Sequence, residues 1–574
     1  MMLKLSSTLC GMFLTSALIL SGCADRNSPA ENANIIIHGG PILTMEGDQP
    51  TYVEAVVVQD GKIVFAGGNA EAMRLKGART VVKDLAGKTL LPGFIDPHSH
   101  FIDSLALADR VNVSGPPVGP ASDPEGIVAA LKAGAAAKRL KPGELLLGWG
   151  YDENLMPDGQ VLSRDILDQA FPDNPVGVIH VSMHGAVINS KAMELYGYTD
   201  GMPTPAGGVI LRKPGTQNLQ GLVMEAGYLP MHSKLPSPGP EQEMAAARSG
   251  QLLYAAAGVT TAQEGATTLP MLQQLQRVAS QDGLIIDVIA YPFITDLDAI
   301  LKVNPVATFG RYDNRLKIGG CKVTVDGSPQ GKTAWFTTPY LTGGPGGEAH
   351  WRGEASLPTD AIRSMVKTCY DNDLQVLMHG NGDAAIDFLI ATHKEMAGAD
   401  LDKDRRTVCI HCQFIRPDQI AEFARLKIIP SLFTDHTFFF GDTHVINRGL
   451  KQAAFISPMK AAIEAGLRPT NHTDAFVVPI DQMMTVWTAV NRPLRSGGVL
   501  GADQRITPYQ ALQAITINAA YQYREDATKG SVTPGKRADF VILSADPTKV
   551  APETIKDIHV VETIKDGRTI YSRP

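Results

Sequence analysis

The pattern of apolar and polar positions divides the chain into two end segments and a long middle. Near the N-terminus, β-branched runs at residues 33–40 and 55–67 are broken by glycine turns, which is typical of short antiparallel strands. Residues 538–543 and 558–568 repeat this pattern near the C-terminus. We therefore expect residues 33–91 and 530–574 to combine into one small β-sandwich domain.

Between these segments, residues 92–529 alternate apolar strand-like runs with helical stretches rich in Ala, Leu, Glu and Lys. This alternation is typical of a parallel sheet covered by helices. Eight runs can be distinguished, and they end near His100, Glu264, Pro292, Asp326, His379, Cys412, Phe433 and Asp474. Eight strands close a barrel, so the pattern predicts the α/β class and a (β/α)8 TIM barrel.

The segment at about residues 104–250 is too long for a single connection between a strand and a helix. It also contains strand-like sequence of its own, such as residues 143–149. We therefore expect an insertion after the first strand of the barrel, and its role is not defined by the pattern.

The first two dozen residues differ in character from the rest. Lys4 supplies a positive charge, and residues 9–20 are apolar but too few to span a bilayer, which predicts an export signal at residues 1–22. Residues 20–23, Leu-Ser-Gly-Cys, resemble a bacterial lipobox, so we expect lipidation of Cys23, a polar tether at 23–32 and a cell envelope lipoprotein. Ala24 resembles the residue that follows the cysteine in lipoproteins on the periplasmic side of the outer membrane. The alternative is an ordinary signal peptide with an incidental cysteine.

Composition restricts the partners of this chain. Its 574 residues, 44% of them hydrophobic, can form one large domain and a smaller one. The formal net charge is -7 and no run of Lys and Arg stands out, so we expect no nucleic acid partner.

The cysteines that follow the signal are few, and we interpret them as too scattered for a disulfide framework: Cys23, Cys321, Cys369, Cys409 and Cys412. Cys409 and Cys412 have the C-x-x-C spacing of redox sites and zinc clips. That interpretation is disfavoured because no second cysteine pair completes a zinc site and the residues lie in an apolar strand-like run.

Candidate metal ligands stand at the ends of several predicted strands: His98 and His100 on the first, His379 on the fifth, His411 on the sixth and Asp474 on the eighth. A single histidine is usually a surface or core residue, but catalytic groups of a barrel gather at the carboxyl ends of its strands, so this combination should converge. His98 and His100 are one residue apart, and an extended backbone directs both imidazoles to one side. Imidazole and carboxylate ligands suit zinc and similar divalent metals.

These motifs resemble a known family, the YtcJ-like branch of the amidohydrolase superfamily, which includes N-substituted formamide deformylases. The resemblance covers nearly the whole mature chain and rests on residues 92–100, 180–192, 258–261, 326–328, 379–383, 473–475 and 530–541. It implies a (β/α)8 barrel with one or two divalent metal ions, for which we expect zinc. It also implies that the five candidate ligands above bind the metal.

The resemblance assigns roles to three further residues. Lys322, on the fourth strand, corresponds to a lysine that relatives with two metals carry as a bridging carbamate; the alternative is an unmodified lysine that contacts substrate or a carboxylate. His184 corresponds to a catalytic residue that holds the carbonyl oxygen or the substrate, with loop structure as the alternative. His472 departs from the Gly-Ser-Asp that relatives more often have before Asp474, and we expect it to line the substrate pocket or to be a packing variant.

The ligand set predicts a hydrolase. A bound divalent metal lowers the pKa of its water to about 7 and polarises a carbonyl. Asp474 would accept a proton and pass it to the departing nitrogen, which an amide requires because an amide anion leaves poorly. We therefore expect cleavage of a carbon–nitrogen bond in an amide, N-acyl, N-formyl or cyclic amide substrate.

Two other functions stay open at this point, namely a metal-dependent ester hydrolase and a catalytically silent lipoprotein that binds a metal or ligand. A run of phenylalanines indicates an apolar pocket wall or core: Phe433, Phe438, Phe439 and Phe440. The expected partners are a small-molecule substrate and the membrane, through the lipid on Cys23, and a homodimer is one option for the oligomeric state.

Overall fold

The computed structural model describes residues 34–106, 110–236, 239–475 and 477–574. The expected signal at residues 1–22, the tether at 23–32 and the lipidated Cys23 lie outside them. Within the described part of the chain, no helix combines the length and the apolar character needed to cross a bilayer.

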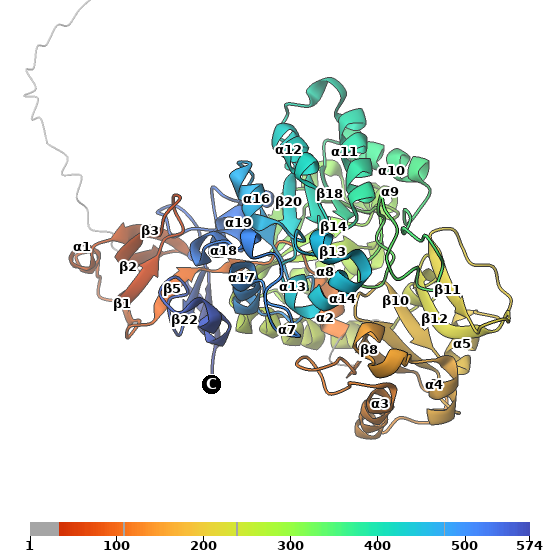
Figure 1. Ribbon diagram of the computed structural model, residues 1–574. Coiled ribbons are helices and arrows are strands. Elements are labelled where there is room, and N and C mark those ends of the chain that lie inside the picture. Colours follow the sequence, from red (N-terminus) through yellow and green to blue (C-terminus); the bar gives the residue numbers. More distant parts are fainter. Residues whose placement is uncertain (1–33, 107–109, 237–238, 476) are drawn as a thin grey trace, which may run out of the picture.

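Strands from both ends of the chain form one sheet, at the left of Figure 1. Its strands are β1 (Ile35–Leu43), β2 (Tyr52–Gln59), β3 (Lys62–Gly67), β4 (Val81–Asp84), β5 (Thr89–Pro92), β22 (Phe540–Leu543), β23 (Val560–Lys565) and β24 (Arg568–Ser572). They pair in the order β24-β23-β22-β5-β1-β2-β3, with β4 beside β1, and β22 runs antiparallel to β5 with Val541 opposite Leu91. The two terminal segments are thus united in a single sheet, and its division into two stacked layers stays a prediction.

Alternation of side chains explains why this sheet is buried on both faces. In β2, Val56 and Val58 belong to one apolar cluster, whereas Ala55 and Val57 belong to another. Successive side chains of a strand point to opposite faces, so a continuous apolar run fits a strand that is covered on both sides. Helix α1 (Asn69–Met73) contributes Ala72 to the second cluster.

The middle of the chain contributes two five-stranded sheets. One has the order β15-β16-β14-β13-β6 and contains β6 (Phe94–Ile95), β13 (Val259–Thr267), β14 (Asp287–Pro292), β15 (Tyr312–Asp313) and β16 (Leu316–Ile318). The other has the order β17-β18-β19-β20-β21 and contains β17 (Gly320–Thr324), β18 (Gln375–Gly380), β19 (Val408–His411), β20 (Ile429–Leu432) and β21 (Thr470–Asn471). All pairings are parallel except that of β15 with β16.

Backbone contacts join the two sheets at both edges. Phe293, just after β14, forms a parallel bridge with Lys322 of β17. At the opposite edge, the backbone N–H of Asp474 donates to the carbonyl of His98 at 3.1 Å, and that of His100 donates to Ala475 at 3.1 Å. Residues that follow β6 and β21 are thereby held side by side.

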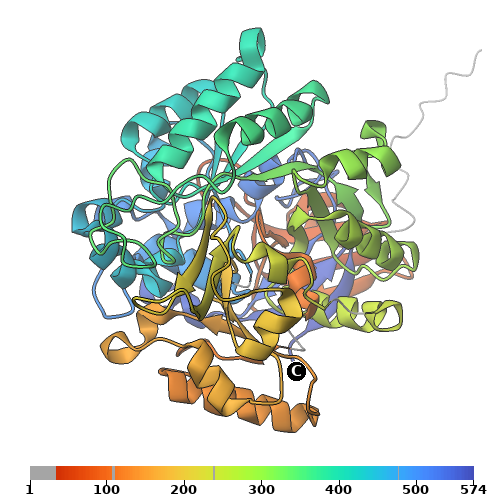
Figure 2. The same ribbon diagram turned by 90° about the vertical axis from the view of Figure 1, so that its right-hand side faces the viewer.

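Helices follow most of these strands and surround them (Figures 1 and 2). They include α7 (Pro240–Ala256), α8 (Leu269–Ser280), α9 (Leu297–Val303), α10 (Thr359–Asp371), α11 (Asp383–Ala397), α12 (Pro417–Leu426), α13 (His436–Phe439), α14 (Gly441–Arg448), α15 (Leu450–Ala453), α16 (Met459–Glu464), α17 (Gln482–Asn491), α18 (Pro508–Ala514) and α19 (Ile517–Gln522). Helix α10 illustrates the pattern, because Ile362, Val366 and Cys369 recur at helical spacing and are buried.

After the short helix α2 (Phe101–Ala106), the expected insertion forms a sheet of its own, in orange and yellow at the lower right of Figure 1. Its order is β11-β12-β10-β9-β8-β7, from β7 (Val111–Asn112), β8 (Leu146–Tyr151), β9 (Val176–His180), β10 (Gly185–Ile188), β11 (Gly208–Arg212) and β12 (Leu219–Glu225). Helices α3 (Pro124–Lys138), α4 (Arg164–Ala170), α5 (Ser190–Tyr196) and α6 (Leu229–His232) accompany it. Gly185 is the partner of Met224, which sets His184 beside Glu225.

Four cysteines form two disulfides, which corrects the expectation that they are too scattered to pair. Cys321 of β17 is bonded to Cys369 of α10, and Cys409 is bonded to Cys412 around Ile410 and His411. The first pair is separated by 48 residues and meets because α10 packs against β17. Spacing along the chain does not reveal such a contact.

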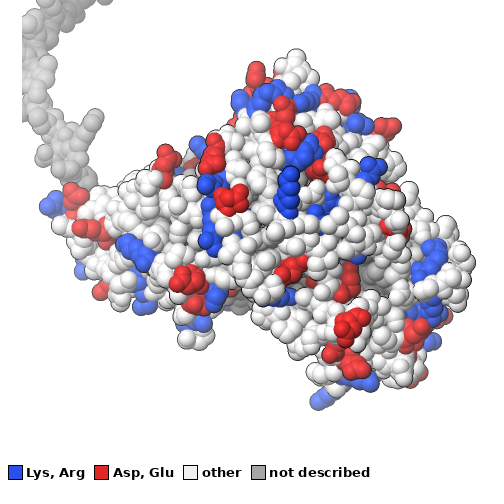
Figure 3. Space-filling model, viewed as in Figure 1, with Lys and Arg blue, Asp and Glu red and all other residues white. Residues whose placement is uncertain are grey.

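A buried ionic network ties the terminal sheet to the middle of the chain. Asp287, at the start of β14, lies 2.6 Å from Nζ of Lys529 and 2.7 Å from Nζ of Lys565 on β23. Lys565 also contacts Asp539 at 2.7 Å, and Lys529 contacts Glu525 at 2.7 Å. On the exterior face in Figure 3, by contrast, positive and negative side chains are intermixed.

Candidate metal centre

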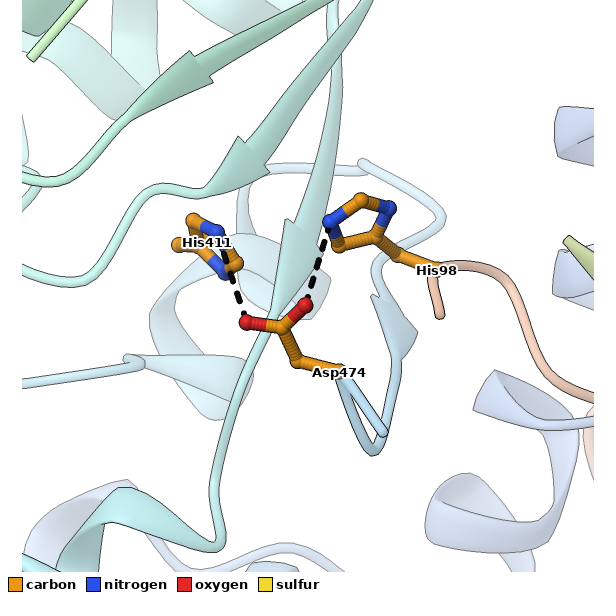
Figure 4. Close-up of side chains that lie close together, drawn as sticks. All are labelled: His98, His411 and Asp474. Atoms are coloured by element: carbon orange, nitrogen blue, oxygen red, sulfur yellow. Dashed lines mark ion pairs between the residues drawn. The ribbon is translucent and has the colours of Figure 1, made fainter. Parts of the chain in front are cut away.

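Three side chains converge where strands of the two central sheets end. His98 lies just after β6, His411 ends β19 and Asp474 follows β21 (Figure 4). Oδ1 of Asp474 lies 3.3 Å from Nε2 of His98, and Oδ2 lies 3.8 Å from Nε2 of His411. One donor atom from each residue falls within 4.8 Å of the others, which is the arrangement of a metal-binding group.

His100 reaches the same carboxylate. Its Nε2 lies 3.4 Å from Oδ1 of Asp474, and its ring centroid lies 5.3 Å from that of His98. Both imidazoles thus reach Asp474, although His98 lies in a bend and His100 is the more exposed of the two.

The protonation of His98 follows from its neighbour Gln263. The Nε2 amide of Gln263 donates to the Pro97 carbonyl and to the Tyr523 hydroxyl, each at 2.9 Å. Its Oε1 must then be the acceptor for Nδ1–H of His98 at 2.5 Å. This hydrogen bond leaves Nε2 of His98 as an acceptor that faces both Asp474 and Nζ of Lys322, and a free acceptor nitrogen is what a histidine needs to ligate a metal.

His472 lies behind His411 and is fully buried. Its Nε2 is 3.0 Å from Nδ1 of His411, and its Nδ1 is 3.1 Å from the hydroxyl of Ser431. Burial lowers the pKa of His472 to about 3. Since both ring nitrogens contact protein groups, the geometry favours the packing alternative for His472, in which it supports His411.

Burial and neighbouring charges shift the pKa values of the groups in this centre in opposite directions. Burial lowers the pKa of His98 and of His411 well below the usual value. Burial raises the pKa of Asp474, but the surrounding histidines, His411 first, outweigh it and hold that pKa well below its usual range. Oδ1 of Asp474 is buried and makes no hydrogen bond with the described residues. Its donor set therefore fits a cation.

Lys322 projects from β17 into the same centre. Its Nζ lies 3.2 Å from Nε2 of His98, and burial lowers its pKa to about 7. The neutral amine is consequently accessible near neutral pH.

His379, at the end of β18, lies beside His411. Its ring centroid lies 4.6 Å from that of His411, but it is not part of the group of three ligand atoms. Nδ1 lies 3.2 Å from Oδ1 of Asp326, in a geometry that is not a hydrogen bond. Asp326 is itself held by three backbone N–H donors, those of Trp335, Asn381 and Gly382.

His184 comes from the insertion and approaches His379, with ring centroids 5.4 Å apart. Its Nδ1 lies 2.9 Å from Oε2 of Glu225, and Oε1 of Glu225 accepts from the hydroxyl of Thr333 at 2.7 Å. Burial lowers the pKa of His184, but the Glu225 carboxylate outweighs it, so the pKa lies above its usual value. A Cβ on Gly327 would come within 2.2 Å of Glu225 and 2.3 Å of Thr333, so glycine is required there.

Sequence reasoning missed the residues that hold the histidines in place, namely Gln263, Glu225, Thr333 and Ser431. Asp326 and Gly327 stood in a motif but had no assigned role. Gln263 lies 165 positions from His98 and Glu225 lies 41 positions from His184, so no local pattern connects the partners. Gln263 is one of several polar residues in the buried strand β13, which reads VTTAQEGAT, so its position does not stand out in the sequence.

The sequence of this chain matches a known protein family. The model of a family described as the amidohydrolase family matches residues 81–571. The chain belongs to the amidohydrolase family. The match begins at β4 of the terminal sheet and spans the two central sheets and the insertion, whereas β1, β2 and β3 lie outside it.

Several proteins are similar to this chain over nearly their full length. Protein LONG AFTER FAR-RED 3 of Arabidopsis thaliana is 27% identical over 562 residues, covering 94% of this chain and 92% of that protein. N-substituted formamide deformylase of Arthrobacter pascens is 25% identical over 540 residues, covering 91% and 95%. Putative amidohydrolase YtcJ of Bacillus subtilis (strain 168) is 24% identical over 557 residues, covering 94% and 99%.

A solved structure shares the fold. An uncharacterized metal-dependent hydrolase from Pyrococcus horikoshii OT3 has a TM-score of 0.71 with 23% identity, covering 90% of this chain and 99% of that one. Its counterpart from Pyrococcus furiosus has a TM-score of 0.69, also with 23% identity, covering 90% and 100%. The mixed α/β architecture of this chain is therefore that of metal-dependent hydrolases of known structure.

Proposed function

We propose that this chain is a metal-dependent hydrolase that cleaves a carbon–nitrogen bond in an amide, N-acyl, N-formyl or cyclic amide substrate. The observation that carries the proposal is the buried Asp474 carboxylate facing the Nε2 atoms of His98 and His411. Gln263 directs a lone pair of His98 at this carboxylate. Facing lone pairs repel one another unless a cation lies between them, so the arrangement favours a divalent metal, with zinc the expected ion.

The proposed ligands are His98, His100, His411 and Asp474, with His379 and Lys322 available for a second ion. Lys322 supports this extension because a neutral amine is the form that reacts with carbon dioxide, and its pKa of about 7 makes that form accessible. A carbamate on Lys322 would replace a positive charge by a negative one beside His98. We propose it as the bridge between two ions.

A divalent cation held at this centre would polarise a carbonyl and acidify a water molecule to a pKa near 7. The chain's own groups complete the chemistry. The ionised Asp474 accepts a proton on Oδ1, the oxygen that makes no hydrogen bond with the described residues, and returns it to the departing nitrogen. His184, protonated by its pairing with Glu225, donates Nε2–H toward the carbonyl oxygen as negative charge develops there.

The preference for a carbon–nitrogen bond is supported by two considerations. Asp474 can act as a proton shuttle, which an amide needs more than an ester does. In addition, one similar protein is named for deformylation of N-substituted formamides. We further propose that the two central sheets close into the (β/α)8 barrel, supported by the backbone contacts at both edges, and that the chain is exported and anchored through Cys23.

A panel of substrates and metal analysis test the proposal. Protein loaded with zinc should release the acid from at least one N-formyl amine, N-acyl amine or cyclic amide, and a chelator should abolish this activity until zinc is restored. Ester hydrolysis without amide hydrolysis would contradict the carbon–nitrogen assignment. Full metal content without hydrolysis of any substrate would contradict the assignment as a hydrolase.

A further inference from the structure

The C-x-x-C segment of the chain contains one of the proposed metal ligands. Cys409 and Cys412 are disulfide-bonded, and His411 lies between them at the end of β19. Both cysteines are fully buried, and neither has a role in the proposed chemistry. The second disulfide, between Cys321 and Cys369, joins a strand to a helix across 48 residues, so the two bonds constrain the chain in different ways.

The apolar side chains of the central strands divide into two clusters. The first, here called the inner cluster, joins strands of both central sheets and includes Ile95, Ile289, Leu377, Val408, Ile410 and Ile429. The second, here called the helix-facing cluster, combines strand residues such as Met378 with Leu389 of α11 and Phe423 of α12. Because successive side chains of a strand point to opposite faces, membership of a cluster reports the direction of a side chain.

Lys322 and His379 follow this alternation. Lys322 comes directly after Cys321, which belongs to the helix-facing cluster. His379 comes directly after Met378 of the helix-facing cluster and two residues after Leu377 of the inner cluster. A regular extended backbone is therefore enough to direct Lys322 and His379 toward the proposed metal centre.

His411 departs from the alternation. In β19, Cys409 belongs to the helix-facing cluster and Ile410 to the inner cluster, so regular extension would point His411 toward the helices. Its Nε2 lies instead 3.8 Å from Oδ2 of Asp474. Regular extension would also turn Cys412 away from the helices, yet Cys412 belongs to the helix-facing cluster. The order of the two faces is thus reversed after Ile410.

The backbone of His411 and Cys412 produces this reversal. His411 has a φ of 72° and Cys412 has a φ of 44°, so both residues lie in the left-handed region. Residues that carry a side chain adopt this region at a cost in free energy. The surrounding structure must therefore hold both residues in this conformation.

The disulfide supplies such a constraint. In a regular strand, Cα atoms three residues apart are separated by roughly 10 Å. A disulfide joins Cα atoms that are at most ~7 Å apart, so it does not form across an extended segment of this length. The Cα atoms of Cys409 and Cys412 are 5.9 Å apart. The bond consequently excludes the extended backbone that would turn His411 toward the helices.

We infer that the Cys409–Cys412 disulfide is a positioning element of the metal centre, because it holds both cysteines on the helix-facing side and thereby directs the imidazole of His411 at Asp474. The inference rests on the proposed function for the bound metal, but the direction of the imidazole can be measured without metal and without turnover. The export that we propose for this chain supports it, since disulfides persist in oxidising compartments.

Two double variants, matched in the number of sulfur atoms removed, test the inference. Cys409→Ala/Cys412→Ala opens this disulfide, and Cys321→Ala/Cys369→Ala, the control variant, opens the other one. The zinc dissociation constant, measured by competition with a chromophoric chelator, should rise roughly ten- to a hundredfold in the first variant, the usual effect of losing a group that orients a ligand. It should stay within about twofold in the control variant, because regular alternation directs Lys322 beside Cys321.

A glycine variant separates the conformation of the segment from its packing. Cys409→Ala/Cys412→Gly also lacks the disulfide, but glycine adopts a positive φ without the steric cost that alanine has. Zinc should therefore bind this variant more tightly than Cys409→Ala/Cys412→Ala and more weakly than the unsubstituted protein. Glycine leaves the larger cavity, so an effect of packing alone would reverse the order of the two variants. The reversed order would overturn the inference.

Crystal structures of the metal-free proteins distinguish failure of the inference from failure of the proposed function. Nε2 of His411 should face Asp474 in the unsubstituted protein and in the control variant, and should turn away from it in Cys409→Ala/Cys412→Ala. This result would support the positioning role even if the chain binds no zinc and hydrolyses no amide.

Three results would each overturn the inference. The first is an unchanged direction of His411 in Cys409→Ala/Cys412→Ala. The second is an equal loss of zinc affinity in this variant and in the control variant. The third is alkylation of Cys409 and Cys412 by iodoacetamide in the unfolded, unreduced protein, which would show that they are free thiols.

Discussion

At the scale of single residues, three histidines of the site are each hydrogen-bonded to a second residue that orients the ring. The pairs are His98 with Gln263, His411 with His472 and His184 with Glu225. Such partners fix the tautomer and the direction of an imidazole, and losing one typically costs a factor of ten to a hundred in affinity or activity. The geometry of the centre therefore depends on Gln263, His472 and Glu225 as well as on the ligands themselves.

Replacement of Asp474 by asparagine tests the central carboxylate. Asp474→Asn keeps the shape but removes the negative charge and the proton acceptor, so kcat/KM for any amide substrate should fall by a factor of about 10³ or more. Bound zinc, measured by atomic absorption, should fall with it. Asp371→Asn is the control, because Asp371 pairs with Lys367 on an exposed helix face. Unchanged turnover in Asp474→Asn would remove this residue from the mechanism.

Replacement of Glu225 by glutamine tests how the insertion contributes. The Glu225 carboxylate holds the pKa of His184 above its usual value, so Glu225→Gln should lower that pKa. The alkaline limb of the profile of kcat/KM against pH should then move to lower pH, with a loss of about tenfold at neutral pH. Zinc content should not change. Glu144→Gln, an exposed position of the same insertion, should leave the profile in place; a loss of activity without any shift of the limb would contradict the role of Glu225.

The ligands themselves could be anticipated from sequence, whereas their supports could not. His98, His411 and Asp474 stand after apolar runs that the pattern identifies as strands, and parallel strands end at one edge. The structure does place them together. His472 was expected to line the pocket or to be a packing variant, and only the packing of β20 against β21 shows that it faces His411 and Ser431.

At the scale of elements, the network around Asp287 joins β14 to β23 and to residues that follow α19. Lys565→Met would leave Asp539 without the partner it has at 2.7 Å and remove one of two lysines from Asp287. Breaking a buried ionic contact on one side costs about 3 to 5 kcal/mol. We expect a lower midpoint of urea unfolding, followed by tryptophan fluorescence. Lys367→Met, on an exposed pair, should change the midpoint little.

Acid should weaken the same network. Burial raises the pKa of Glu525, but Lys529 and Lys317 outweigh it and lower that pKa from its usual 4.5 to about 2. A carboxylate whose pKa is lower in the folded state contributes stability above its unfolded pKa, and this contribution is lost as the pH falls toward the folded pKa. Stability should therefore decrease between about pH 4.5 and pH 2. A constant unfolding midpoint across this window would contradict the burial of the network.

Strands were predicted well where the apolar runs are long and poorly where they are short. The runs ending near Pro292, His379 and Phe433 correspond to β14, β18 and β20. The pair β15 and β16 was missed, because two and three residues carry no detectable alternation. β16 is ordered by its pairing with β14, a contact that sequence periodicity cannot report.

At the scale of the whole molecule, a bound metal should contribute to stability. A ligand that binds only the folded state stabilises it by RT ln(1 + [L]/Kd), about 4 kcal/mol at a thousandfold excess over Kd. Removing zinc with a chelator should lower Tm, and adding it back should restore Tm. In Asp474→Asn the chelator should have a much smaller effect. A Tm that does not respond to zinc in the unsubstituted protein would contradict the proposed centre.

The overall architecture was only partly accessible from sequence. Repeated alternation indicated the parallel strands and the insertion, because each of these features leaves a local trace. The contacts between distant segments left none: Cys321 meets Cys369, and Thr333 meets Glu225 of the insertion across 108 positions. Such contacts depend on how complete elements pack, and they decide the geometry of the site.

The pairing of β5 with β22 has a consequence for how the chain reaches its native state. β5 ends at Pro92, two residues before β6 begins, but β22, the strand that pairs with β5, begins only at Phe540. Synthesis and the proposed export both proceed from the N-terminus, so β5 emerges long before its partner β22 does. During that interval one edge of a buried strand is unprotected and open to aggregation. A nascent chain of this kind should depend on a chaperone until its last 35 or so residues emerge.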